Sequence, residues 1–278
     1  MSKELAIAVI HGIGSQGANR PQNSDEPTFS KELQKRVYSK LGNTKSSKIA
    51  WREIFWADIL QSRQDTYLRK IKRKTRFDEL REFVLCNLSD ASAYRYNPND
   101  SNDNTYSLIH NRVFQTISEL ENDVSEGAPL IVLAHSMGGH IMSNYIYDAT
   151  KKSDDDCSTF CRLKTMAGFV TFGCNIPLFT FSYAPEHVTP IAFPGTELSK
   201  AKQVKPWWLN FYDKDDVLGF PLAEIGPRYK AMADAKELRE KAINAGSWLS
   251  SWNPASHNAY WRDDDFYIPV SNFIKKLL

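Results

Sequence analysis

Short runs of apolar residues recur along this chain, and stretches with helical periodicity separate them. Residues 5–10, 130–134 and 168–174 consist mainly of apolar residues, which is typical of strands buried on both faces of a parallel sheet. Residues 49–56 alternate between apolar and polar positions and predict a further strand, and residues 207–212 predict one more.

Helical patterns lie between these strands. Residues 29–41 carry an apolar side chain at every fourth position, which is the pattern of an amphipathic helix. Residues 106–124 and the segment from 137 to about 147 are also expected to be helical, and a helix over residues 266–278 is expected to close the chain. Residues 231–245 fit either a helix or a helix that runs into a last strand. The alternation of strands and helices favours an α/β fold with a doubly wound, mostly parallel sheet.

Two longer stretches interrupt this alternation and predict insertions. Residues 58–105 contain two apolar helical faces followed by a polar loop, and we expect a helical cap over the edge of the sheet. Residues 175–206 are rich in proline and aromatic residues, and an irregular insertion is expected there. A chain of 278 residues can form one α/β domain or two small ones. No internal repeat is visible, and residues 1–278 are interpreted as a single domain that carries both insertions.

The composition is that of an ordinary soluble globular protein, with 42% hydrophobic and 24% charged residues. A formal net charge of +2 gives no indication of a nucleic-acid partner. No apolar run approaches the ~18 residues of a membrane span. The first residues lead directly into a predicted strand and leave no room for a signal peptide. The cysteines lack metal-ligand spacing and fit free thiols in a reducing compartment, so a cytoplasmic location is expected.

The most informative motif is the sequence AHSMG at residues 134–138, where a predicted strand meets a predicted helix. A strained strand-to-helix turn at Ser136 needs little bulk two residues to either side, and Ala134 and Gly138 meet that need. The turn would expose the Ser136 hydroxyl above the sheet edge, beside the N–H groups that open the helix. This arrangement is the nucleophile elbow of serine hydrolases, with alanine in place of its first glycine. The alternative is a buried strand that ends in an incidental turn of small residues.

A serine nucleophile needs a base within hydrogen-bond reach and a carboxylate that orients the base. In folds with this elbow the chain order is Ser, then Asp or Glu, then His. Asp213, Asp215 and Asp216 follow the predicted strand 207–212, at the end where parallel sheets place their sites. His257 precedes the predicted final helix. The alternative interpretation of the aspartates is a solvated acidic turn.

In this order the motifs resemble the α/β-hydrolase superfamily, and within it the bacterial lipases and lipase-like serine esterases. The resemblance rests on residues 11–14 after the first predicted strand, on residues 134–139, on the turn at 215–217 and on residues 256–261. It therefore extends over nearly the whole chain.

The resemblance implies a role for several residues. It implies a catalytic triad in which Ser136 is the nucleophile, His257 the general base and Asp215 the acid that orients the histidine. It also implies an oxyanion hole formed by the backbone N–H groups of Ile13 and Met137. No cofactor is implied.

Three aspartates could supply the acid. In members of the family the acid is followed by one further residue and then by an aliphatic pair. Asp215 fits this frame, since Asp216 comes next and an aliphatic pair follows. Asp213 lies one strand alternation earlier and is the second candidate, and Asp216 is the third.

The other histidines are interpreted as structural. His11 is expected to shape the loop of the oxyanion hole without transferring protons, and His135 is expected to point away from the partner of the serine hydroxyl. His140 is expected to pack or to cap a helix, and His110 and His187 lie in no motif. No group of His, Cys or carboxylate residues has metal-ligand spacing, and the glycines after the first strand lack the rest of a dinucleotide or phosphate-loop motif. Neither a metal nor a cofactor is therefore expected.

The expected function is hydrolysis of a carboxylic ester through an acyl-enzyme on Ser136. Acyl transfer or thioester cleavage could use the same triad, and a non-catalytic binding module on a hydrolase fold is a further alternative. The aromatic second insertion and the apolar faces of the cap suit a small-molecule ester or lipid with a hydrophobic acyl or alcohol group. The basic run at residues 69–76 is interpreted as a solvated helix face or, alternatively, as a peripheral contact with an anionic membrane.

Overall fold

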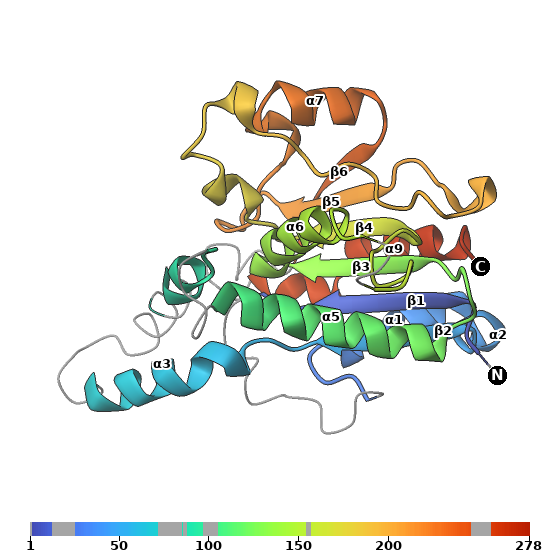
Figure 1. The fold of residues 1–278 in the computed structure, drawn as a ribbon, viewed down its shortest axis with the longest axis horizontal. Helices are drawn as coiled ribbons and strands as arrows, with labels where there is room; N and C mark the ends of the chain where they lie inside the picture. The colour runs from blue at the N-terminus through green and yellow to red at the C-terminus, as the bar shows by residue number, and fades with distance from the viewer. Residues whose placement is uncertain are drawn as a thin grey trace.

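Four of the six strands of this protein are buried at every residue, because protein covers both faces of the sheet that they form. The computed structural model describes residues 2–12, 26–71, 85, 88–96, 105–153, 157–245 and 257–278. Six strands form one sheet in the order β2-β1-β3-β4-β5-β6 (Figure 1). They are β1 (Leu5–Ile10), β2 (Ile49–Ile54), β3 (Leu130–His135), β4 (Met166–Phe172), β5 (Trp208–Asp213) and β6 (Leu238–Ile243). Every neighbouring pair of strands runs parallel.

Alternate residues of the strands enter two separate cores, one on each face of the sheet. On one face α1 (Lys31–Leu41) and α9 (Asp264–Lys275) pack against each other, and α5 (Thr105–Asp123), α6 (Met137–Ala149) and α7 (Pro227–Asp234) cover the other face (Figure 1). Helices on both faces of a parallel sheet define a doubly wound α/β fold. The predicted fold class is confirmed to this extent, and all six strands are parallel.

The strand order reverses next to β1, and this reversal positions the site. β2 lies on one side of β1, whereas β3 and the later strands lie on the other. Open α/β sheets commonly bind their ligands at such a point, beyond the carboxyl ends of the strands. The register places Ile10 beside Ala134 and His135 beside Phe172, so the segments after β1, β3 and β4 emerge together. Both chain ends lie at the opposite, amino end of the sheet (Figure 1).

The segment that fitted two interpretations, residues 231–245, forms a helix followed by a strand. α7 ends at Asp234, and β6 begins at Leu238 and pairs with β5 at the edge of the sheet. The middle of β6 is partly or fully exposed, which explains its weak apolar pattern.

Shorter elements connect the strands and helices. Residues 175–206 contain the 3-10 turns η2 (Ile176–Phe179), η3 (Pro185–His187) and η4 (Lys200–Lys202), joined by irregular segments as the sequence predicts. The remaining short elements are α2 (Asn43–Ser46), η5 (Ala223–Ile225) and η6 (Ala259–Arg262). The last of these leads into α9.

β2 differs from its predicted alternation, because all six of its residues are buried. Arg52 pairs with Asp123 of α5 at 2.7 Å. The Glu53 carboxylate accepts hydrogen bonds of 2.6–2.9 Å from the backbone and hydroxyl groups of Thr28 and Ser30. Buried charges are tolerated where they are paired and hydrogen-bonded in this way. These contacts join the edge strand to α5 and to the segment that enters α1.

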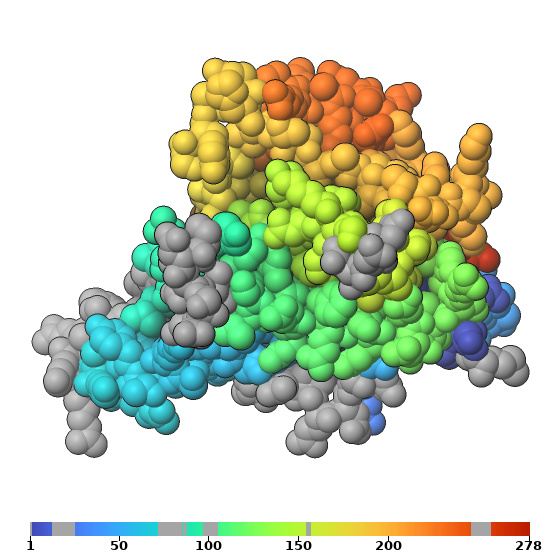
Figure 2. Space-filling view, in the orientation of Figure 1, coloured from blue at the N-terminus to red at the C-terminus, as the bar shows by residue number. Residues whose placement is uncertain are grey.

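α3 (Asp58–Ile71) extends past the carboxyl end of the sheet (Figure 1 and Figure 2). Its Gln64 side chain donates to Ser89 Oγ at 2.8 Å and to Asp90 Oδ1 at 2.5 Å. These hydrogen bonds tie α3 to the helical segment 88–93. The helical character predicted for this part of the chain is present where the structure describes it.

Part of the predicted cap, residues 72–84, 86–87 and 97–104, lies outside the described residues. α3 ends with Arg69 and Lys70 in its last turn, and residues 72–76 of the predicted basic run are likewise outside. In the described parts of the chain, no helix has the combined length and apolar character that crossing a bilayer requires.

Gly168 of β4 lies directly against Phe273 of α9, and this contact tests the packing between sheet and helix. A Cβ atom at residue 168 would lie 2.3 Å from Phe273 Cε1 and 2.6 Å from Cζ. We expect Gly168→Ala to lower the free energy of unfolding by about 1–3 kcal/mol, as overpacking does in other cores. Urea denaturation measures the change.

Phe273→Leu provides the matched background, because it removes both ring atoms that the added methyl group would meet. In that background Gly168→Ala should lower the free energy of unfolding clearly less than it does in the wild-type protein. An equal loss in both backgrounds would show that the ring does not limit the space at residue 168.

Candidate active site

The chain turns from strand to helix at Ser136. β3 ends at His135 and α6 begins at Met137, so the serine alone forms the turn. Its φ of 54° and ψ of −126° lie in a region that residues with a Cβ atom rarely adopt. Such backbone strain persists only where the surrounding structure enforces it, and it is concentrated at functional sites. The strand, turn and helix predicted around this serine are all present.

Two glycines let the backbone approach this turn closely. A Cβ atom at Gly12 would lie 2.4 Å from Ser136 Cβ and 2.9 Å from Ser136 Oγ. A Cβ atom at Gly138 would lie 2.8 Å from the carbonyl oxygen of His11. Only glycine fits at either position. The segment after β1 therefore runs directly against the serine side chain.

His257 brings a distant segment of the chain onto the serine. Its Nε2 lies 2.7 Å from Ser136 Oγ, and its Nδ1 lies 3.0 Å and 2.9 Å from the two carboxylate oxygens of Asp216. Ser136 is 1% exposed, and His257 and Asp216 are each 5% exposed. The hydroxyl, the imidazole and the carboxylate thus form one buried hydrogen-bonded chain, which lies beyond the carboxyl ends of the strands.

The structure brings Asp216 to His257 rather than the predicted Asp215, and this corrects the choice made from the sequence. Asp215 is exposed, and its backbone N–H donates to Asp213 Oδ1 at 2.8 Å. Asp213 Oδ2 accepts a hydrogen bond of 2.5 Å from the backbone N–H of Ala245. Asp213 therefore shapes the turn after β5, and the turn directs the next buried carboxylate, that of Asp216, to the imidazole.

Two further donors hold Asp216, and neither was expected from the sequence. Tyr260 Oη donates to Asp216 Oδ2 at 2.8 Å, and the Leu218 N–H donates to Asp216 Oδ1 at 3.0 Å. Burial alone would raise the pKa of Asp216, but the hydrogen bond and charge of His257, together with these two donors, hold that pKa below its usual value. The carboxyl group is thus kept ionised beside the imidazole. Tyr260 lies three residues after His257, a helical spacing that could have identified it.

The structure describes one of the two backbone donors that were predicted to form the oxyanion hole. Met137 is the first residue of α6, so its backbone N–H has no acceptor within the helix. This N–H group lies next to Ser136, at the positive end of the helix dipole. Ile13, the other predicted donor, lies outside the described residues.

His11 holds the segment after β1 in place. Its Nε2 accepts a hydrogen bond of 3.2 Å from the backbone N–H of Trp56, so Nδ1 carries the proton and donates to the Gly12 carbonyl oxygen at 2.6 Å. The imidazole stacks on the Trp56 ring with centroids 5.2 Å apart. Burial lowers the pKa of His11 to about 4, so the ring is neutral. These contacts agree with the structural role predicted for His11.

His135 lies against His257, and the prediction that it points away from the partner of the serine is wrong. Its Nε2 lies 2.7 Å from the carbonyl oxygen of His257, and the two ring centroids are 4.7 Å apart. Alternation along a strand would place His135 and Ser136 on opposite faces. That alternation ends at Ser136, because its backbone leaves the extended conformation.

His140 lies on α6 and His110 lies on α5. Neither takes part in the hydrogen-bonded chain of Ser136, His257 and Asp216. His140 stacks on Phe179 with centroids 3.8 Å apart, and His110 Nε2 lies 2.7 Å from Tyr94 Oη. Burial lowers the pKa of both histidines to about 4. His187 is exposed in η3. All three keep their structural interpretation.

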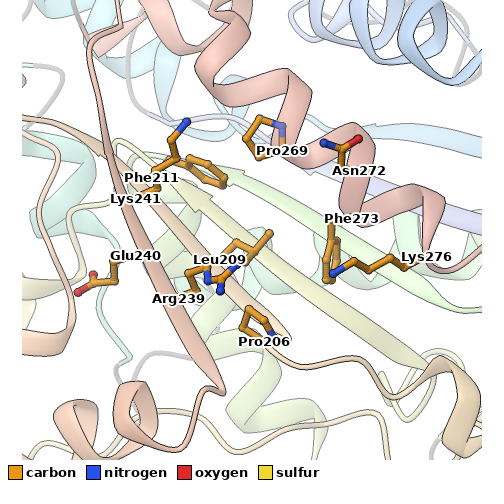
Figure 3. Close-up of a pocket in the computed structure, with 10 residues that line it drawn as sticks. All are labelled: Pro206, Leu209, Phe211, Arg239, Glu240, Lys241, Pro269, Asn272, Phe273 and Lys276. Atoms are coloured by element: carbon orange, nitrogen blue, oxygen red, sulfur yellow. The ribbon is translucent and has the colours of Figure 1, made fainter.

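A groove of about 410 Å³ opens between β5, β6 and α9, away from these residues (Figure 3). Leu209, Phe211 and Phe273 line it together with the basic side chains of Arg239 and Lys276. None of the three residues of the hydrogen-bonded chain lines it. Within the described ranges, no group of three or more His, Cys, Asp or Glu residues is arranged to hold a metal ion.

No protein-family model matches this chain, and no curated protein is significantly similar to it. The geometry alone therefore indicates what the site can do. A serine hydroxyl is a weak nucleophile unless a neighbouring base takes its proton, and a carboxylate keeps that base in the right tautomer and orientation. Ser136, His257 and Asp216 have the contacts that this chemistry needs. The arrangement can support attack of the hydroxyl on an electrophilic carbonyl carbon.

Neutral histidines that are buried or half-buried make the stability of this protein depend on pH. Burial lowers the pKa values of His11, His110 and His140 to about 4 and that of His135 to about 3. In the unfolded chain each of them binds a proton near pH ~6.5. Between these values the unfolded state binds more protons, so stability falls as the pH falls. Asp90 acts in the opposite sense, because burial raises its pKa to about 7 and the folded state keeps its proton.

We expect the free energy of unfolding to decrease as the pH falls from about 6.5 to about 4. His140→Gln should reduce the slope by up to about 1.4 kcal/mol per pH unit, the contribution of one proton. Asp90→Asn should make the slope steeper and is a control of opposite sign. Urea denaturation at a series of pH values measures these slopes. A wild-type stability that stays constant or rises on acidification would contradict the neutral state of these histidines.

Proposed function

We propose that this protein is a serine hydrolase of the α/β-hydrolase type that cleaves carboxylic esters through an acyl-enzyme on Ser136. The observation that carries the proposal is the hydrogen-bonded chain from Ser136 through His257 to Asp216, with contacts of 2.7 Å and 2.9 Å. His257 lies 121 residues from Ser136 and 41 from Asp216 along the sequence, so only the fold brings them together. Buried titratable groups arranged in this way are typical of functional sites.

The positions of the residues in the sheet also support the hydrolase type. The serine follows β3 on a strained turn, the aspartate follows β5, and the histidine follows β6. The α/β-hydrolases use this chain order of nucleophile, acid and histidine, with the nucleophile on a sharp turn between a strand and a helix.

In the proposed acylation, Ser136 Oγ attacks the ester carbonyl carbon while His257 Nε2 takes the hydroxyl proton. Asp216 stays ionised and stabilises the imidazolium through the hydrogen bond to Nδ1. The backbone N–H of Met137 donates to the oxyanion of the tetrahedral intermediate. His257 then gives its proton to the alcohol that leaves, and the acyl group remains on Ser136.

A water molecule completes the proposed cycle. His257 takes one proton from the water as its oxygen attacks the acyl carbon. Collapse of the second tetrahedral intermediate breaks the bond to Ser136 Oγ, which recovers its proton from His257. The carboxylic acid is released, and the hydrogen-bonded chain is restored.

Exposed apolar side chains on two segments that adjoin residues of the site support a hydrophobic ester or lipid as substrate. Phe181 and Val217 are 80% and 78% exposed. Val217 lies in the turn after β5, and Phe181 follows η2, whose Phe179 stacks on His140 one helical turn beyond Ser136. Exposed aromatic and aliphatic groups beside a site commonly contact the apolar part of a ligand. An apolar acyl or alcohol group is therefore proposed.

Ser136→Ala tests the nucleophile. The wild-type protein should release a burst of chromophore from an activated acyl ester and react with a fluorophosphonate. The variant should do neither and should lose at least about 10³-fold in rate, because the acyl group has no attachment point. Ser143→Ala, also on α6, is the matched control. Release of the free acid, rather than transfer to an added alcohol, separates hydrolysis from acyl transfer, and equal rates for Ser136→Ala and wild type would reject the proposal.

Asp216→Asn and Asp215→Asn form a matched pair within one turn. Asp216→Asn should lower kcat by about 10²–10⁴-fold, because the neutral amide neither stabilises the imidazolium nor selects the correct tautomer. Asp215→Asn should stay within about twofold of the wild type, because its side chain faces solvent. Steady-state kinetics on one activated ester measures both. A larger loss for Asp215→Asn than for Asp216→Asn would contradict the assignment.

A further inference from the structure

His135 forms a second link between β3 and His257, separate from the contact made by Ser136. Its Nε2 donates to the backbone carbonyl oxygen of His257 at 2.7 Å. A carbonyl oxygen only accepts, so Nε2 carries the proton and Nδ1 is unprotonated. Nδ1 has no hydrogen-bond partner among the residues that the structure describes. The ring is therefore oriented by its contact with the main chain of His257.

Aromatic rings enclose His135 and fix its orientation. Its ring centroid lies 4.7 Å from that of His257, 5.0 Å from Phe172, 5.2 Å from Trp261 and 6.1 Å from Tyr260. Phe172 is the neighbour of His135 in the register between β3 and β4. The donor is thus held by the sheet itself, which is a more rigid support than a loop.

We infer that His135 is a positioning residue that holds the backbone of His257 at a fixed place relative to Ser136. The inference rests on the proposed function, because it takes His257 as the general base. Asp216 orients the imidazole ring through Nδ1, but the place of the ring also depends on where the main chain of residue 257 lies. His135 and Ser136 are consecutive, so one strand end fixes both the carbonyl and the imidazole. A displacement of about 1 Å in such a contact can cost about 10²-fold in rate.

His135 can keep this contact while His257 changes its charge. Burial, followed by the neighbouring His257, lowers the pKa of His135 to about 3. The other titratable groups that influence it are Asp216, which raises this pKa, and His11, which lowers it. A neutral His135 keeps its donor on Nε2. It also adds no positive charge beside the imidazolium that forms on His257 in the proposed reaction.

Three substitutions distinguish the contribution of the His135 hydrogen bond from that of its aromatic ring. His135→Phe keeps an aromatic ring without a donor, His135→Gln places an amide N–H near the position of Nε2, and His135→Asn is too short to reach the carbonyl. We expect the rate of Ser136 labelling by a fluorophosphonate, and kcat for an activated ester, to fall about 10- to 100-fold in the Phe and Asn variants. KM should change little, and the Gln variant should recover to within about fivefold of the wild type.

A readout on His257 itself separates positioning from a general loss of stability. The Nδ1 proton that His257 shares with Asp216 should give a far-downfield proton resonance in the wild type and in His135→Gln. This resonance should be lost or shifted in His135→Phe. His110→Gln makes the same change in another neutral histidine, which is half-buried. This control should leave both the labelling rate and the resonance unchanged.

Labelling at the wild-type rate with an unchanged resonance in His135→Phe would overturn the inference. If circular dichroism shows that His135→Phe does not fold, the Gln and Asn variants decide, and equal rates for these two overturn it. Loss of labelling in Ser136→Ala together with full labelling in His135→Phe would refute positioning and leave the proposed function intact. Labelling that persists in Ser136→Ala would refute the proposed function, whereas the resonance still tests the contact because it needs no substrate.

Discussion

The close packing of the ends of β1 and β3 determines the geometry at the carboxyl edge of the sheet. The two strands are neighbours where the strand order reverses, and Gly12 lets the chain after β1 run against the side chain of Ser136. A non-glycine residue with positive φ persists only where its surroundings enforce that conformation. The hydroxyl therefore has one well-defined position, and the imidazole and carboxylate are arranged around it.

The polar groups around this position support one another. His257 is held at Nε2 by Ser136, at Nδ1 by Asp216 and at its carbonyl by His135. Asp216 is held in turn by Tyr260 and by a backbone N–H group. Buried polar groups are costly when they are only partly satisfied, whereas a connected network stiffens the structure around it. If the site acts as proposed, groups that are already oriented need little reorganisation as charge develops, and in enzymes such preorganisation is a major source of catalysis.

The sequence predicted much of the sheet, because strands covered on both faces are mostly apolar and therefore stand out. The turn at Ser136 was also predictable, since only small residues fit around it. The choice among the aspartates was not, because the side chain of Asp213 folds the turn after β5 and decides which carboxylate points inward. β6 gave a weak pattern because its middle residues lie at an exposed edge. The orientation of His135 was not predictable, because it depends on the residue at which the extended conformation of β3 ends. The pattern of apolar and polar residues does not indicate that point.

The two ends of the chain lie at the amino end of the sheet, across the molecule from Ser136 (Figure 1). A purification tag, a fusion partner or a solid support attached at either terminus would lie at the amino end of the sheet. The carboxyl edge of the sheet, where Ser136 lies, would then point away from the support in an immobilised preparation. A protein tethered through either of these chain ends would likewise lie away from the carboxyl edge of the sheet.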